Sequence, residues 1–192
     1  MYVRDAKNRD EAWLLDHIED LWLDETAFRS RDYVIAVDQR EKERAGFGRV
    51  RIHKTEEGER CELTSIGVLD EWRDQGVGAH VVERLVQTAG DKGFDEVYTL
   101  TGDVNYLRQF GFERIDPESL PDRLQERLAE KQAGVEPDAV PMRIVPERFR
   151  MPRRLREGFK GATPDDEETE PEEGPEDFGI DPEEATYKYD TG

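Results

Sequence analysis

The chain has 192 residues, a formal net charge of −19 and charged side chains at 39% of its positions. Its single cysteine excludes an internal disulfide, and no run of about 18 apolar residues predicts a membrane span. The first residues also lack the apolar stretch of a signal peptide. We therefore expect a cytoplasmic protein with one folded domain and no membrane partner.

Acidic residues are concentrated at the C-terminal end of the chain. Residues 161–192 contain 13 of the 47 Asp and Glu residues and a single lysine, which gives them a net charge of −12. Few of their side chains are apolar, so we predict a disordered acidic tail there. Residues 146–160 are rich in arginine and are predicted to be a basic linker, which leaves residues 1–145 as the folded domain.

Lysine is scarce along the chain, accounting for 7 of the 28 basic residues, whereas acids are abundant throughout. An acid-rich and lysine-poor surface suits a cytoplasm of very high salt, where repulsion between like charges is screened. We therefore expect a halophilic protein. A coding bias toward arginine is the alternative explanation.

The pattern of apolar residues predicts strands that alternate with helices. Expected strands are residues 1–5, 33–37, 45–53, 62–68, 97–101, 111–115 and 140–144. Expected helices are residues 8–22, 77–89 and 103–110, and a further helix that begins at Pro121. Residues 62–101 read as strand, helix and strand, which is the pattern of a parallel crossover. The predicted fold class is therefore α/β, with a mixed central β-sheet flanked by helices.

The turn after the strand 62–68 is rich in glycine. Gly76 and Gly78 lie where the next helix begins, and Arg73 comes just before them. Backbone N–H groups at a helix start lack partners and carry the positive end of the dipole, and glycine lets a phosphate approach them. We predict an anion-binding turn, with a plain tight turn as the alternative. A dinucleotide-binding fingerprint is rejected, because Val81 replaces its third glycine.

Three segments together resemble the GNAT acetyltransferase superfamily: residues 62–68, the Arg-x-x-Gly-x-Gly turn at 73–78, and residues 106–112. The order of the elements fits as well, over about residues 1–145. The resemblance implies that acetyl-CoA is the co-substrate, with its pyrophosphate on the turn and its pantetheine arm along the preceding strand. The cofactor-binding residues that it implies are Ile66, Gly67, Val68, Arg73, Asp74, Gln75, Gly76, Val77, Gly78, Ala79 and Asn105.

Acetyl transfer to an amine needs a base for the amine and an acid for the departing thiolate. The resemblance places a catalytic glutamate base at Glu62, which usually acts through water; a surface glutamate is the alternative. Many relatives carry a tyrosine acid where this chain has Leu107, and Tyr106 is shifted by one residue, which rotates a helical side chain by about 100°. No acid is therefore assigned, and solvent can protonate the thiolate.

The region from Leu100 to Met142 resembles short N-acetylglutamate synthase-like members of the superfamily. This subgroup implies a small-molecule amine acceptor, in particular an amino acid, with arginines for its carboxylates. The candidates are Arg29, Arg31, Arg51 and Arg108, unless these are solvated surface residues. The alternatives are a peptide or protein amine acceptor, or an acetyl-CoA-binding regulatory module without turnover. No metal and no nucleic acid are expected as ligands, and the sequence carries no signal for an oligomeric state.

Overall fold

The computed structural model describes residues 1–164, so residues 165–192 of the predicted tail lie outside the described residues. Seven strands form a sheet in the order β1-β2-β3-β4-β5-β7-β6. Neighbouring strands are antiparallel except β4 and β5, which are parallel. This arrangement confirms the predicted α/β fold with a mixed sheet. The strands are β1 (Tyr2–Asp5), β2 (Tyr33–Val37), β3 (Arg44–Thr55), β4 (Gly58–Val68), β5 (Val97–Thr101), β6 (Glu113–Arg114) and β7 (Val140–Ile144).

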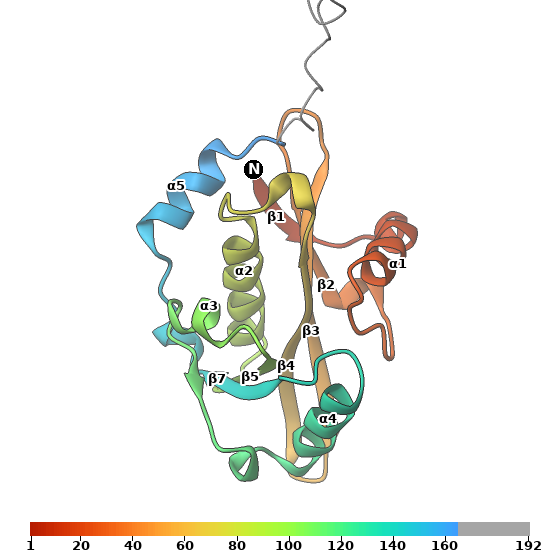
Figure 1. Cartoon of the computed structure of the whole chain (residues 1–192), viewed down its shortest axis with the longest axis vertical. Helices are drawn as coiled ribbons and strands as arrows, with labels where there is room; N and C mark the ends of the chain where they lie inside the picture. The colour runs from red at the N-terminus through yellow and green to blue at the C-terminus, as the bar shows by residue number, and fades with distance from the viewer. Residues whose placement is uncertain (165–192) are drawn as a thin grey trace, which may run out of the picture.

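Helices cover both faces of the sheet (Figure 1). One face carries α2, α3 and α5, and the other carries α1 and α4. The bounds are α1 (Glu11–Asp20), α2 (Val77–Asp91), α3 (Val104–Arg108), α4 (Asp122–Ala133) and α5 (Arg153–Gly161). Short 3₁₀ turns occur at Asn8–Asp10, Ser30–Asp32, Asp70–Trp72, Pro117–Ser119 and Pro146–Arg148. Within residues 1–164, no helix is both long enough and apolar enough to cross a membrane.

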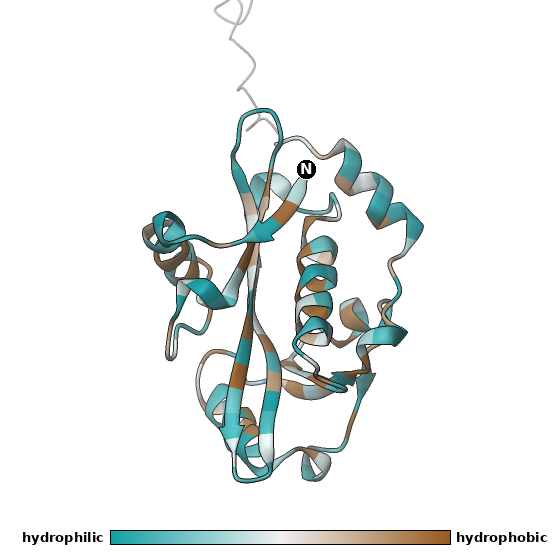
Figure 2. Ribbon diagram, turned by 180° about the vertical axis from the view of Figure 1, so that it is seen from behind, coloured by the Kyte–Doolittle hydropathy of each residue, from teal (hydrophilic) through white to brown (hydrophobic). Residues whose placement is uncertain are grey.

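Strand β2 is buried along its whole length because it supplies both cores. Its alternate residues Val34 and Ala36 join the core under α2, whereas Tyr33 and Ile35 join the core under α1. Successive side chains of a strand point to opposite faces, so a strand that helices cover on both sides is apolar at every position. Apolar residues accordingly follow both the central strands and α2 in Figure 2.

Strands β4 and β5 pair over a short stretch and then part. Their register runs from Cys61↔Val97 to Leu63↔Thr99, and no pairing follows on the β5 side of β4. Beyond this point β4 has one more residue than β3 opposite it, and Ser65 takes a φ of 49°. The extra residue is a β-bulge, which bends a strand and ends regular pairing. The parted strands create the opening in which the candidate site lies.

The arginine-rich segment that the sequence predicts as a linker contains helix α5, which packs on α2. Leu155 and Phe159 are buried, and the Phe159 ring stacks on His80 at a centroid distance of 3.8 Å. These two apolar residues are four positions apart, so they share one helical face. The neighbouring arginines are exposed. Because they dominate the composition of this segment, it was predicted to be a linker and not a helix.

Candidate active site

The turn before α2, residues 73–79, presents backbone N–H groups. Within residues 1–164, the N–H groups of residues 74–79 have no hydrogen-bond acceptor. Gly76 starts the helix with a φ of 78°, a left-handed conformation that favours glycine. Its carbonyl oxygen accepts from His80 N at 3.2 Å and lies 2.9 Å from His80 Nδ1. Unpaired amides at the start of a helix are groups that can bind an anion.

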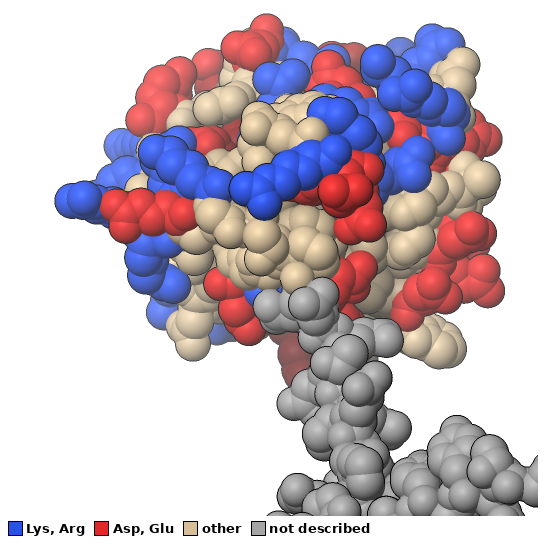
Figure 3. Space-filling model, turned by 90° about the horizontal axis from the view of Figure 1, so that it is seen from above, with Lys and Arg blue, Asp and Glu red and all other residues tan. Residues whose placement is uncertain are grey.

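The side chains of this turn point away from the amides. Arg73 is exposed and pairs with Asp70 at 2.8 Å. The Gln75 amide binds Thr163 twice, because Nε2 donates to its carbonyl oxygen at 2.7 Å and Oε1 accepts from its N–H at 2.9 Å. Figure 3 views the end of the molecule where α2 begins and shows lysine and arginine side chains gathered across it, with acidic side chains between them. The turn therefore offers backbone donors in a surrounding of mixed charge.

A cavity of about 420 Å³ occupies the gap between the parted strands. Of the predicted cofactor residues, Ile66, Val68 and Gly78 line it. Gly67 is not among the lining residues, and a Cβ added to it would meet Leu21 at 2.7 Å. Asn105 is exposed and is not part of the cavity wall. The cavity thus joins the second half of β4 to the start of α2, while Asn105 lies apart from it.

Tyr106 and Leu107 both line the cavity, although they are adjacent on α3. The Tyr106 hydroxyl oxygen lies 3.0 Å from the position that a Cβ on Gly78 would occupy. Burial raises the pKa of Tyr106 to about 12, so its phenol is a neutral donor near pH 7. The one-residue shift therefore does not remove Tyr106 from the cavity.

Glu62 is fully buried and does not line the cavity. Its Oε2 accepts from His53 Nε2 at 2.7 Å and lies 3.5 Å from Arg127 Nε. Its Oε1 has no hydrogen-bond partner in the part of the chain that the structure describes. Thr64, two residues along the same strand, does line the cavity. The burial of Glu62 excludes the alternative that it is a surface glutamate. Its neighbours lie between it and the cavity.

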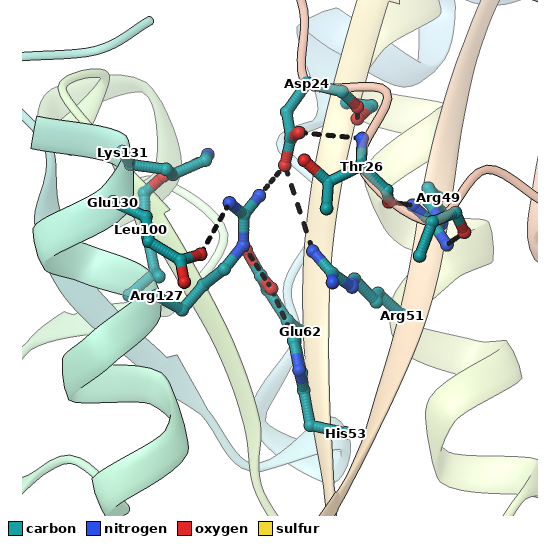
Figure 4. Close-up of polar contacts among 12 residues, drawn as sticks. Asp24, Thr26, Arg49, Arg51, His53, Glu62, Leu100, Arg127, Glu130 and Lys131 are labelled. Atoms are coloured by element: carbon teal, nitrogen blue, oxygen red, sulfur yellow. Dashed lines mark hydrogen bonds and ion pairs between the residues drawn. The ribbon is translucent and has the colours of Figure 1, made fainter. Parts of the chain in front are cut away.

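Those neighbours form what we call the buried polar cluster: Asp24, Arg51, His53, Glu62 and Arg127 (Figure 4). Arg127 comes from α4 and forms an ion pair with Asp24, which lies on the loop after α1 and lines the cavity. Arg51 Nη1 lies 3.9 Å from Asp24 Oδ2. Burial lowers the pKa of both guanidinium groups, and nearby carboxylates oppose this shift, Glu62 at Arg51 and Glu130 at Arg127.

The structure separates the four arginines that the sequence proposes for carboxylate binding. Arg51 belongs to the buried polar cluster, whereas Arg29, Arg31 and Arg108 are exposed and form no ion pair with its members within residues 1–164. Arg127 is not among the residues proposed from the sequence. A signal for it exists, because Arg127 lies in the apolar stripe of α4 with Leu124, Leu128 and Lys131. A charged residue in such a stripe indicates a buried, partnered role.

The chain matches the Acetyltransferase (GNAT) family over residues 3–112. It is 30% identical over 64 residues to the uncharacterized N-acetyltransferase CT2212 of Chlorobaculum tepidum, a stretch that covers 33% of this chain and 41% of that protein. This chain therefore spans less than half of that relative.

Solved structures share the fold at low sequence identity. N-acetylglutamate synthase from Neisseria gonorrhoeae, complexed with coenzyme A and N-acetyl-glutamate, has a TM-score of 0.60 at 15% identity, covering 75% of this chain and 34% of that one. Rv2747 from Mycobacterium tuberculosis, in complex with CoA and NLQ, has a TM-score of 0.59 at 17% identity, covering 76% and 99%. Arabidopsis thaliana Naa50, in complex with the bisubstrate analogue CoA-Ac-MVNAL, has a TM-score of 0.52 at 15% identity, covering 74% and 97%.

These likenesses show that the overall fold is shared. Within residues 1–164, this chain combines a seven-stranded mixed sheet, a cavity between β4 and β5, and unpaired amides at the start of α2. The family match over residues 3–112, which is more than half of the chain, identifies it as a member of the GNAT acetyltransferase family.

Proposed function

We propose that the chain transfers the acetyl group of acetyl-CoA directly to the amine of an amino acid. The observation that carries this proposal is the pair of buried arginines, Arg51 and Arg127, directly behind the cavity-lining Asp24. Guanidinium groups hold carboxylates with planar, charge-assisted hydrogen bonds, and burial strengthens that attraction. The acceptor's carboxylate is therefore expected to bind this arginine pair while its amine faces the cavity.

The co-substrate fits the groups that the fold leaves free. The N–H groups of residues 74–79 would hold its phosphates, and the stretch of β4 beyond Leu63 would hold its pantetheine arm. Acetyl-CoA supplies an activated thioester when bound there. On the β5 side of this stretch, backbone groups have no strand partner in residues 1–164, so an extended ligand arm can add to the strand edge.

Glu62 is proposed as the base that takes the amine proton. Its Oε1 is free of partners in residues 1–164, while His53 fixes Oε2. The Thr64 hydroxyl is also unpartnered there and lines the cavity on the same strand. We assign the proton path to Thr64 and an intervening water, since Glu62 itself does not reach the cavity. Tyr106 is the neutral hydroxyl available to protonate the departing thiolate.

Direct transfer is supported by the position of the single cysteine. Cys61 lies in the core under α2, on the opposite strand face from Glu62. Burial raises the pKa of its thiol to about 12, so it does not ionise to a nucleophile near pH 7. An acetyl-cysteine intermediate is therefore not part of the proposal.

A peptide amine is the second candidate acceptor, and one feature favours it. Trp22 is 85% exposed and Val135 is 55% exposed, and both line the cavity. An exposed apolar rim suits the side chains of a peptide as well as those of a free amino acid. Naa50, which shares the fold, was crystallised with a peptide-containing bisubstrate analogue.

Thiol release from acetyl-CoA separates these candidates. Free amino acids, the same amino acids as carboxamides, and short peptides are compared at equal concentration. We expect kcat/KM for the preferred amino acid to exceed that of its carboxamide at least about tenfold, because a lost charged hydrogen bond costs about 1.5–3 kcal/mol. Preference for peptides would overturn the amino-acid proposal, and no release with any amine would favour the non-catalytic alternative.

The role of Glu62 is tested by Glu62→Gln, with Glu59→Gln as the matched control on the exposed part of β4. Losing a general base lowers turnover by roughly 10²–10⁴-fold. Acetyl-CoA affinity, measured by calorimetric titration, is expected to stay close to the parent value in both variants. Equal turnover of Glu62→Gln and the parent near neutral pH would remove Glu62 from the base role.

A further inference from the structure

Asp24 lies on the loop Leu21–Ala27, which follows α1 and forms part of the cavity wall. Its anchors are few and specific. Ser65 Oγ donates to the Asp24 carbonyl at 2.6 Å, and Arg49 donates to the carbonyl oxygens of Thr26 at 2.8 Å and Ala27 at 2.5 Å. The first half of the loop is also held by α1, because the N–H groups of Leu21, Trp22 and Leu23 donate to carbonyl oxygens of that helix. At Asp24 itself, the carboxylate adds ion pairs with Arg51 and Arg127.

The loop is held in a conformation that the chain does not favour by itself. Trp22 has a φ of 54° and Ala27 a φ of 51°, in a region that non-glycine residues rarely adopt. The Trp22 side chain is 85% exposed although it borders the cavity. Such a loop is expected to rearrange when a contact that fixes it is exchanged for another.

Asp24 is the only member of the buried polar cluster that comes from a loop. Arg51, His53 and Glu62 belong to the sheet, and Arg127 belongs to α4. Asp24 Oδ1 accepts from Thr26 N at 2.9 Å, and Oδ2 faces both Arg127 and Arg51 (Figure 4). One carboxylate oxygen is therefore used by the loop itself, and the other meets the arginine pair.

The charges of the cluster require a carboxylate at the position of Asp24. Without it, the cluster would hold two buried guanidinium groups and one buried carboxylate, that of Glu62. Glu130 also pairs with Arg127, but its side chain is about half exposed. An uncompensated buried charge is strongly unfavourable, whereas exchange of one carboxylate for another leaves the buried charge unchanged. A carboxylate entering from the cavity can therefore replace Asp24 at low cost.

We propose that the Asp24 carboxylate occupies the acceptor-carboxylate subsite in the free protein and is displaced when a carboxylate-bearing acceptor binds Arg51 and Arg127. This inference rests on the proposed amino-acid function for the identity of the natural ligand. Displacement releases the Asp24 side chain and changes the surroundings of Trp22, two residues earlier on the loop, while the bonds of Leu21–Leu23 to α1 stay in place. A ligand without a carboxylate lacks the charge needed for the exchange and leaves the loop in place.

The exchange is measured without turnover, with acetate as the probe and acetamide as its uncharged counterpart. The full-length Asp24→Ala variant is titrated in the absence of acetyl-CoA, and its melting temperature is recorded. Glu25→Ala, an exposed acidic residue on the same loop, is the matched control. We expect acetate to stabilise Asp24→Ala at concentrations at least about tenfold lower than those that affect the parent protein or Glu25→Ala. Equal responses of all three proteins, or equal effects of acetate and acetamide, would overturn the inference.

Two further arms cover a variant that fails to fold. Asp24→Asn keeps the shape of the side chain and removes its charge, so it carries the same acetate test. In the parent protein, an amino-acid acceptor is expected to change the emission of Trp22, and the change should vanish in Trp22→Phe. Absence of any Trp22-dependent change at saturating acceptor would overturn the displacement of Asp24 whatever the behaviour of the variants.

Kinetics distinguish a displaced carboxylate from a catalytic one. If Asp24 competes with the acceptor, Asp24→Asn should lower KM for the amino acid at least about threefold and keep kcat. A loss of kcat of about a hundredfold would instead make Asp24 catalytic and overturn the inference.

If no amino acid is acetylated but acetate binds as expected, only the proposed function fails. If amino acids are acetylated but acetate stabilises Asp24→Ala no more than the parent protein, only this inference fails.

Discussion

The turn at residues 73–79, which we propose holds phosphate and call the phosphate turn, and the buried polar cluster present their polar groups in opposite ways. The turn works with backbone N–H groups from one short segment, and its side chains point elsewhere. The cluster works with side chains from the loop after α1, from β3, β4 and α4. The turn should therefore tolerate changes of side chain but no added bulk at its glycines, whereas the cluster should respond most to changes of charge.

The largest effect is expected for Arg127→Gln in the buried polar cluster. This change leaves Asp24 and Glu62 without their shared cation, and breaking a buried ion pair costs about 3–5 kcal/mol. The free energy of unfolding, measured with urea, should fall by that amount. Acetyl-CoA affinity of the remaining folded protein should change little.

Arg123→Gln is the matched control on the same helix. Arg123 is 35% exposed and pairs with the exposed Glu126 and Glu130, so its loss should cost no more than about 1 kcal/mol. Similar losses of stability in the two variants would mean that the buried ion pairs of Arg127 contribute no more than the exposed ones of Arg123. The buried polar cluster would then not depend on charge more than the turn does.

An intermediate effect is expected for Gly76→Ala in the phosphate turn. The added Cβ would lie 2.2 Å from the Leu155 carbonyl oxygen of α5, and the φ of 78° is strained for alanine. Each of these two effects costs about 1–3 kcal/mol. Acetyl-CoA binding, followed by calorimetry, should weaken by at least tenfold because the amides lose their alignment.

Two variants control this result. Gly93→Ala has a similar φ of 86° but nothing within 4 Å, so it tests the backbone conformation alone. Arg73→Ala removes an exposed side chain of the turn and should weaken binding by a factor of about five or less. If Arg73→Ala proved as harmful as Gly76→Ala, side chains rather than backbone would dominate the turn.

The smallest effect concerns pH and the contact of α5 with the turn. Burial lowers the pKa of His80 below its ordinary value of 6.5, with Glu83 opposing the shift and Arg156 adding to it. The unfolded chain then binds a proton more readily than the folded one, so the stability contributed by neutral His80 is complete above pH 6.5 and is lost as the pH falls. His80→Phe keeps the stacking on Phe159 and removes the titration. Urea melts at pH 7.5 and 5.5 should show a smaller loss of stability for this variant than for the parent, and equal losses would contradict the assignment to His80.

Predictability differs between the two regions for a physical reason. The sheet, α2 and the glycine turn follow from apolar periodicity and from Gly76, since helix starts and strand faces are local properties. Helix α5 is missed because Leu155 and Phe159 are its whole apolar stripe among arginines. Strand 111–115 shrinks to Glu113–Arg114, since this segment is the sheet edge and pairs with β7 alone.

The α/β sheet, the glycine turn before α2 and the resemblance to acetyltransferases could be predicted from the sequence, because they depend on neighbouring residues and backbone groups. The folded chain was needed to show that Arg127 and Asp24 meet beside Arg51 and Glu62, and that Arg29, Arg31 and Arg108 do not. Such a meeting depends on how α4 and the loop after α1 pack against the sheet, and the energy of a buried charge depends on every partner that the packing brings to it.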